Sequence, residues 1–208
     1  MEKNIKILII SSLFFLFFKI IAIYYTKLGL HGDEAQYWIW SKELSWGYYS
    51  KPPLLPYVIR FFSFLTGDSV FGIKIISVIF YLITSTIIYL ITKKMMGVRI
   101  AIVSSLTFFL LPGVSFSSFI VSTDILLILF WSLSLLQLLI IKERPNALNF
   151  VLLGVFVGLA FLAKYAGIYF IFSMFFLLFE EKSRNFFFKN KLFFFYFILS
   201  FLFVIAPN

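Results

Sequence analysis

Long apolar runs separated by short polar connections make up most of the chain, and each run is a candidate membrane-spanning helix. The runs cover residues 5–25, 70–91, 100–116, 125–141, 148–162, 166–179 and 192–206. A helix needs about 20 mainly apolar residues to cross the hydrocarbon core of a bilayer. The pattern therefore predicts about seven spans. The first is expected to be retained, because it lacks the small-residue cleavage site of a signal peptide.

The composition supports a membrane location. Hydrophobic residues make up 62% of the 208 residues, charged residues make up 13%, and the mean hydropathy is +1.03. Soluble domains are about half apolar and a quarter charged, so this chain is not a soluble globule. The chain has no Cys, which excludes disulfides and thiolate metal sites. We predict an all-α, multi-pass integral membrane protein whose residues 1–208 form a single transmembrane domain.

Basic residues between the predicted spans set the expected orientation. Positively charged residues in short loops favour the cytoplasmic side. With the N-terminus inside, the cytoplasmic connections hold Lys3, Lys6, Lys93, Lys94, Arg99, Lys142, Arg144, Lys182, Arg184, Lys189 and Lys191. The excess of 18 basic over 9 acidic residues is then mostly topological, and we expect no nucleic-acid partner. We expect a bacterial inner-membrane protein with a cytoplasmic N-terminus.

One connection, the first external loop at residues 27–69, is far longer than the others. It carries three of the four Trp residues and the only His. Long loops in compact proteins are often functional, so the site is sought there.

The first half of the loop has a helical pattern. Asp33 is in position to cap a helix, Tyr37, Trp40 and Leu44 share one face, and Gly47 ends the pattern. Its aromatic residues suit the headgroup region, so the pattern predicts a helix lying in the membrane interface.

A second short element is predicted after Pro52 and Pro53. Its apolar face is expected to consist of Leu54, Val58, Phe61 and Phe62, with Arg60 beside them. We predict an interfacial or re-entrant helix and not a full span.

Three carboxylates near the external side are candidate site residues. Asp33 and Glu34 are either a helix cap with a solvated neighbour or part of a site. Asp124 follows Ser122 and Thr123 at the external start of an apolar run. It is either a first-turn residue favoured by the helix dipole or a functional group, since ionisable residues at such places often mark sites.

Lys51, Arg60 and Tyr49 are candidate phosphate-binding residues in the same loop. The two cations are expected to lie at the interface, with their stems in the apolar layer and their charges among lipid phosphates. Tyr49 is one of the aromatic residues expected at headgroup depth.

Several of these strings together resemble a known family. Asp33 to Trp38, Gly47 to Leu54, Gly67-Asp68, Ser122 to Asp124 and Gly158 to Tyr165 occur in this order. They resemble the N-terminal part of membrane glycosyltransferases of the GT-C fold. The family in question includes protein O-mannosyltransferases and lipid A aminoarabinose transferases.

The resemblance implies a GT-C-like helical bundle and an inverting sugar transfer. The donor would be a polyprenyl-phosphate-linked sugar, and the acceptor a lipid, glycan or protein at the periplasmic or luminal face. Asp33 would be the base or the carboxylate that orients the acceptor, and Lys51 would offset charge on the departing phosphate. Asp124 would orient the donor or the acceptor, or bind a divalent metal ion, and Glu34 would share that work. Some relatives have a carboxylate where this chain has Ser50, so metal dependence stays open.

Two other readings remain at this point. Charged residues beside an apolar bundle also suit a small subunit that transports or flips a lipid-linked sugar. Alternatively, the chain is a truncated, inactive remnant. Since relatives are longer, the leading reading is itself a GT-C transferase or the N-terminal portion of a longer GT-C module. The sequence does not specify the sugar, the acceptor or the oligomeric state.

Overall fold

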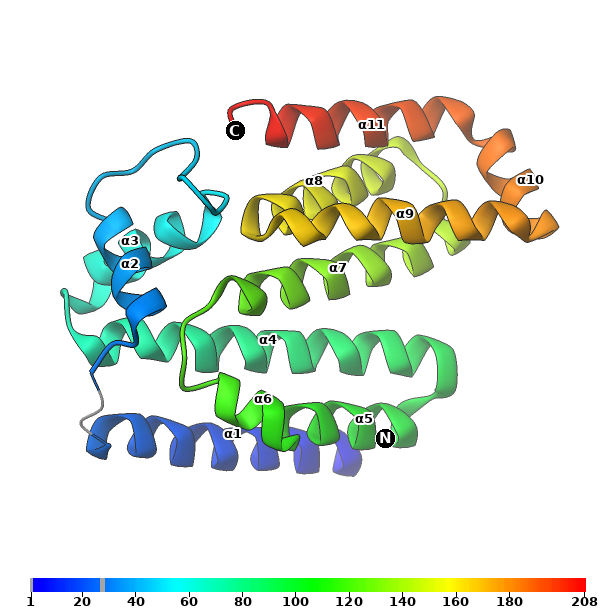
Figure 1. Cartoon of the computed structure of the whole chain (residues 1–208). Coiled ribbons are helices and arrows are strands. Elements are labelled where there is room, and N and C mark those ends of the chain that lie inside the picture. Colours follow the sequence, from blue (N-terminus) through cyan, green and yellow to red (C-terminus); the bar gives the residue numbers. More distant parts are fainter. Residues whose placement is uncertain (1, 27–28) are drawn as a thin grey trace. The chain divides into compact units, whose positions relative to one another are not determined.

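The computed structural model describes residues 2–26 and 29–208, and most of them are helical, with no strand in these ranges (Figure 1). The prediction of an all-α chain is confirmed. The described residues form two compact units, Met1–Ser45 with Leu55–Ile125 and Trp46–Leu54 with Leu126–Asn208. Lys27 and Leu28, at the start of the predicted external loop, lie outside the described residues.

The first unit is built around three helices that pack against one another, with shorter helices at their ends. Its helices are α1 (Glu2–Tyr25), α2 (Gly32–Trp40), α3 (Leu54–Thr66), α4 (Val70–Met96), α5 (Val98–Leu110) and α6 (Pro112–Ser117). Gly97 has a φ of 88°, which few other residues tolerate, and it lets α5 follow α4 immediately. The hydroxyls of Ser85 and Ser105 each donate to the other residue's carbonyl at 2.9 Å, which fixes the α4–α5 contact.

The second unit contains the remaining helices, except that residues 123–125 at the start of α7 belong to the first unit. They are α7 (Thr123–Glu143), α8 (Ala147–Ala163), α9 (Tyr169–Phe176), α10 (Glu181–Lys189) and α11 (Lys191–Ile205), with 3₁₀ turns at Tyr165–Ile168 and Leu177–Phe179. α8 and α11 approach closely because Gly154 and Gly158 present no side chain. A Cβ atom on Gly154 would collide with the carbonyl of Phe197 in α11. The core includes Phe150 and Leu153.

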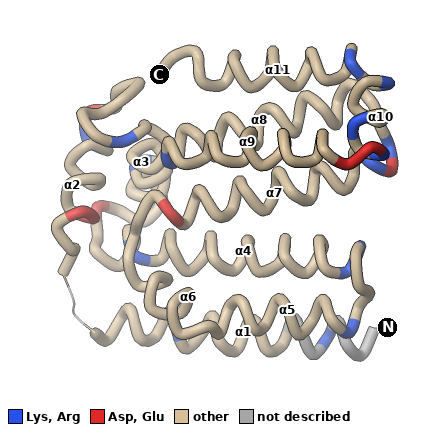
Figure 2. The backbone as a smooth tube through the Cα atoms, turned by 45° about the vertical axis from the view of Figure 1, so that its right-hand side comes forward, with Lys and Arg blue, Asp and Glu red and all other residues tan. Residues whose placement is uncertain are grey.

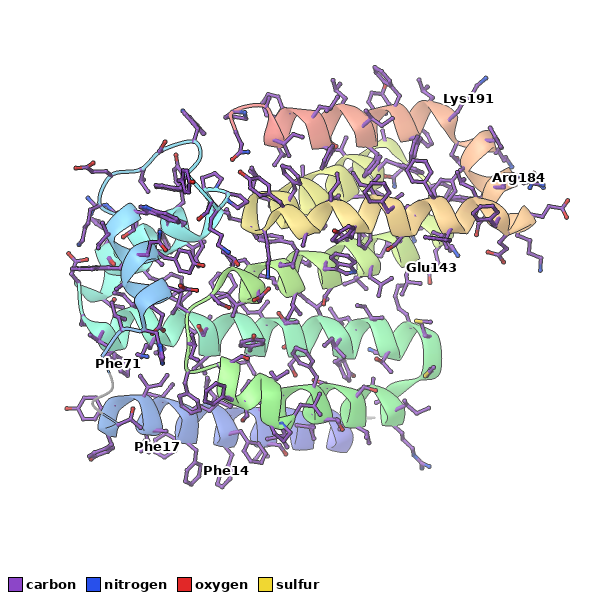
Figure 3. The ribbon with its side chains drawn as sticks, viewed as in Figure 1. Phe14, Phe17, Phe71, Glu143, Arg184 and Lys191 are labelled. Carbon is purple, nitrogen blue, oxygen red and sulfur yellow. The ribbon has the colours of Figure 1, made fainter. Side chains whose placement is uncertain are left out.

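The helices fit a membrane environment. By length and composition, two helices of the described chain, α4 and α7, are able to cross a membrane, and α10 with α11 would make a third span bent by 82°. Phe14 and Phe17 are exposed and point away from α1, as expected for side chains that contact lipid (Figure 3). The chain is an all-α membrane protein. The number of seven spans stays a prediction.

Charged residues gather at the ends of the helices in each unit (Figure 2). In the first unit, Lys93, Lys94 and Arg99 lie at the connection between α4 and α5, whereas Asp68 precedes the other end of α4. In the second unit, basic residues lie around the end of α7 and along α10. This separation leaves the middle of the helices mostly apolar.

The predicted third span, residues 100–116, is interrupted. α5 ends at Leu110 and α6 begins at Pro112. Proline lacks the backbone N–H that would continue the hydrogen-bond ladder, and it suits the first position of a new helix.

Two details of the predicted loop helices were wrong. α2 ends at Trp40, so the pattern that ran through Leu44 to Gly47 overestimated its length. The face of α3 that is buried consists of Leu55, Pro56, Ile59 and Ser63, whereas Phe61 of the predicted face is 60% exposed. Apolar residues surround most of α3, so hydropathy alone did not identify which side faces the protein.

Candidate functional site

α2 places the adjacent carboxylates Asp33 and Glu34 on different sides. The helix begins at Gly32 with His31 as its N-cap, so the prediction of Asp33 as the cap was wrong. The Glu34 carboxylate accepts the backbone N–H of His31 at 2.7 Å, which is the side-chain contact of a capping box. Asp33 lies in the first turn and is exposed.

Glu34 is fully buried, and both of its carboxylate oxygens have partners. Its Oε2 lies 3.2 Å from Nζ of the buried Lys74 in α4, and its Oε1 accepts the N–H of Val121 at 2.7 Å. The cost of burying each charge is offset by the opposite charge and by these hydrogen bonds. The pair therefore ties α2 and α4 to the chain that leads into α7.

We call residues 118–121 the tethered segment, because each of them is bonded to a side chain from another helix. The bonds are Lys19 Nζ to Ser118 Oγ at 2.9 Å, Lys74 Nζ to the Phe119 carbonyl at 3.2 Å, Ser77 Oγ to the Ile120 carbonyl at 2.8 Å, and Val121 N–H to Glu34. The segment lies between α6 and α7 and leads directly to Thr123 and Asp124. Side chains from α1, α2 and α4 thus fix the start of α7.

The phenol of Tyr37 is influenced by both Asp33 and Asp124. Its side chain is buried in the first unit and is hydrogen-bonded to Thr123. Burial is the main reason that the pKa of the Tyr37 phenol is raised, and the negative charges of Asp33 and Asp124 raise it further. Both carboxylates therefore act on the same hydroxyl, one from α2 and one from the first turn of α7.

The far end of α2 is held by a second set of polar contacts. Lys42 forms an ion pair with Asp68, and the Trp38 indole N–H donates to the same carboxylate at 3.4 Å. The Lys42 ammonium also lies 4.8 Å from the centre of the Trp38 ring. The hydrogen bond from Lys42 is the main cause that lowers the pKa of Asp68. This exposed set links α2 to the turn before α4.

The candidate phosphate-binding residues are divided between the units. Arg60 is exposed on α3 of the first unit, whereas Lys51 and Tyr49 belong to the second unit. The Tyr48 N–H donates to the Lys51 carbonyl at 3.1 Å and closes a turn before the buried Pro52. Tyr49 is fully exposed.

The site contains residues that the sequence analysis did not assign to it. Tyr37 was interpreted only as part of an interfacial face, and Lys74 was not assigned a role. Two signals were present: Glu34, Tyr37 and Ser41 have helical spacing, and Lys74 is an ionisable residue within an apolar run. No group of three His, Asp or Glu side chains that would hold a metal ion occurs in residues 2–26 and 29–208, including around Asp124.

Comparisons with known proteins identify the family. The dolichyl-phosphate-mannose-protein mannosyltransferase family matches residues 50–208, a range that includes Lys51 and Asp124 but not Asp33 or Glu34. The lipid A galacturonosyltransferase RgtD of Rhizobium johnstonii is 33% identical over 153 residues, which are 73% of this chain. The aligned part is 32% of RgtD, so the chain spans about a third of that relative's length. No solved structure matches the chain. From the family match and this relative, the chain belongs to the dolichyl-phosphate-mannose-protein mannosyltransferase family.

Proposed function

We propose that the chain is a membrane glycosyltransferase, or the part of one that carries the reacting carboxylates. It would move a sugar from a polyprenyl-phosphate carrier to an acceptor hydroxyl at the external face of the inner membrane. The observation that supports this most strongly is that the negative charges of Asp33 and Asp124 both act on the buried phenol of Tyr37. Family membership supports the reaction class.

Asp33 is the residue we assign as the general base. It is exposed in the first turn of α2, so an acceptor can reach it. Its carboxylate would take the proton of the acceptor hydroxyl as that oxygen forms a bond to the anomeric carbon. The bond from that carbon to the phosphate oxygen breaks on the opposite face, which inverts the configuration. The polyprenyl phosphate leaves with the electron pair.

The departing phosphate requires a cation. We assign this role to Lys51, with Arg60 and Tyr49 as further donor-binding residues. A positive charge placed where negative charge develops lowers the barrier to bond cleavage. The rigid Pro52-Pro53 pair after Lys51 restricts its backbone and supports a fixed position. We also expect membrane lipids to be partners of the chain.

Asp124 is assigned to orienting a substrate hydroxyl, and Tyr37 to supplying a buried hydroxyl on which the charges of Asp124 and Asp33 act. Since burial and these negative charges raise the pKa of the Tyr37 phenol, it stays protonated at neutral pH and is able to donate a hydrogen bond.

Glu34 is assigned a positioning role and not a share in the work of Asp124 on a substrate or metal ion. Both of its oxygens are engaged, and the side chain is fully buried. Together with Lys74 it holds the tethered segment, and thereby Asp124, against α2. This revises the catalytic role expected for Glu34 from the sequence.

The comparison with RgtD favours one class of acceptor over the others. RgtD is by name a galacturonosyltransferase that acts on lipid A, whereas the family description names protein acceptors. We favour a lipid acceptor, because the matched relative is the more specific comparison. The test is a transfer assay on membranes that contain the chain, with a radiolabelled polyprenyl-phosphate sugar as donor.

Label that moves into the lipid fraction, with release of polyprenyl phosphate, is the expected result. Label in protein would correct the acceptor class alone. Label that stays on the carrier with both acceptors, in membranes where the chain is folded, would contradict the proposed activity.

A further inference from the structure

The second unit contains an apolar cavity that the proposed transfer reaction does not use. Its volume is about 420 Å³, and it is bounded by α9, α10 and α11. All residues that line it are apolar, including Met174, Phe187, Phe194, Phe197 and Leu202. The volume falls in the range of about 300–1,000 Å³ that is usual for small-molecule sites. Because no lining side chain offers a polar atom for recognition, the chemistry of the walls suits hydrocarbon.

Two cations lie where the walls of the cavity begin. Arg184 precedes the lining residues Phe187 and Phe188 by three and four positions on α10. Lys191 likewise precedes Phe194 by three positions on α11. Residues at these spacings are neighbours on one face of a helix. Arg184 and Lys191 are both exposed, and Figure 3 shows both around α10.

The placement of α10 suits a membrane surface. α10 and α11 are bent by 82° relative to each other, so α10 does not continue the direction of the span. Lys182, Arg184 and Lys189 are exposed on this short helix, together with Phe188. A short helix that combines exposed basic residues with an exposed Phe suits the headgroup boundary.

Nearby acidic groups do not cancel the charge of the rim. Glu180 accepts a hydrogen bond from the Ser183 hydroxyl at 2.6 Å at the start of α10, and Glu181 lies in the first turn. Both lie within one turn of Arg184 and away from Lys189 and Lys191. Residues 180–191 hold four basic residues against these two carboxylates, so the segment is net positive.

We propose that the cavity holds a hydrocarbon chain of an anionic phospholipid, whose phosphate is held by Arg184 and Lys191. An apolar wall with a cationic rim matches an amphiphile that is negative at one end. A zwitterionic lipid would fill the cavity equally well but would gain less from the rim. A further apolar helix would also cover the walls, but would leave the two cations without a role.

The test compares lipids that differ in headgroup charge. The purified chain is stripped of lipid in a neutral detergent and offered equal amounts of phosphatidylglycerol and phosphatidylcholine with matched acyl chains. Native mass spectrometry counts the lipid that stays bound. We expect a preference for phosphatidylglycerol of about fivefold for each of the two cations, from the typical attraction between a basic side chain and an anionic surface.

Variants separate the rim from the walls. Arg184→Gln with Lys191→Gln should abolish the headgroup preference, whereas Leu202→Trp should fill the cavity and reduce the binding of both lipids. The matched control is Lys142→Gln with Arg144→Gln, which removes two cations around the end of α7 and should keep the preference.

Three outcomes would overturn the proposal. They are equal binding of the two lipids to the unaltered chain, a preference that survives the Arg184 and Lys191 substitutions, and unchanged lipid binding in Leu202→Trp. A thermal melt of each variant in the same detergent confirms that the compared chains are folded.

Discussion

Removing Lys74 should destabilise the first unit more than most single substitutions, because it leaves the buried carboxylate of Glu34 without a counter-charge. In Lys74→Met, the apolar side chain is similar in length, but Glu34 keeps only the N–H groups of His31 and Val121 as partners. Breaking a buried ion pair from one side typically costs about 3–5 kcal/mol. The bond from Lys74 to the Phe119 carbonyl is lost as well.

The double variant Glu34→Gln with Lys74→Met separates the charge from the shape. Gln is nearly the same size as Glu and can still accept the Val121 N–H, but it carries no charge. The remaining cost should then be about 1–3 kcal/mol, the usual penalty for a buried hydrogen-bonding group left without a partner. The double variant should therefore be more stable than Lys74→Met alone.

The assay has two parts. Equilibrium unfolding in mixed micelles gives the stability of each variant, and hydrogen exchange followed by mass spectrometry gives the protection of residues 118–122. Lys74→Met should lower both, with the loss of protection centred on the tethered segment. The reasoning would be refuted if Lys74→Met were as stable as the unaltered chain, or if the double variant were less stable than the single one.

Three further predictions concern other parts of the chain. Gly154→Ala should cost about 1–3 kcal/mol in an unfolding assay, because the new Cβ meets the backbone of α11, whereas Gly113→Ala has open space and should cost little. The pKa of the Tyr37 phenol is raised in the folded chain. The stability that this phenol contributes is therefore complete below its unfolded pKa of about 10, and it is lost as the pH rises through the higher pKa of the folded state. A spectrophotometric titration should then lose one late-ionising phenol in Tyr37→Phe. In the Cys-free chain, an impermeant thiol reagent should label Ser45→Cys in intact cells but Met95→Cys only after the inner membrane is opened, and the reverse result would invert the predicted orientation.

The apolar runs were enough to predict most of the helices. Membrane-spanning segments satisfy their backbone hydrogen bonds internally, so a long apolar run has few alternatives to a helix. The break between α5 and α6 could also have been predicted from the sequence, because Pro112 interrupts a helix in any environment. The prediction of one span over residues 100–116 used hydropathy alone, and it therefore merged α5 and α6.

The arrangement of the site was only partly predictable. The resemblance drew attention to Asp33 and Asp124, but not to Tyr37, whose phenol is affected by both carboxylates. The pairing of Glu34 with Lys74 joins positions 40 residues apart, and a single sequence does not tell how α2 is aligned against α4. The helical spacing of Glu34 from Tyr37 placed it on the buried face of α2. A carboxylate is rarely buried without a partner, however, and the sequence did not identify Lys74 as that partner.

The central claim is that Asp33 is the carboxylate on which sugar transfer depends. The most direct measurement is the rate of sugar transfer from the polyprenyl-phosphate donor by Asp33→Asn, compared with Glu43→Gln as the matched control from the same loop. Asn keeps the size of Asp33 but cannot accept the proton, so we predict a fall of about a hundredfold or more, with Glu43→Gln close to the unaltered chain. Equal rates for the two variants, or a loss in Glu43→Gln alone, would contradict the assignment.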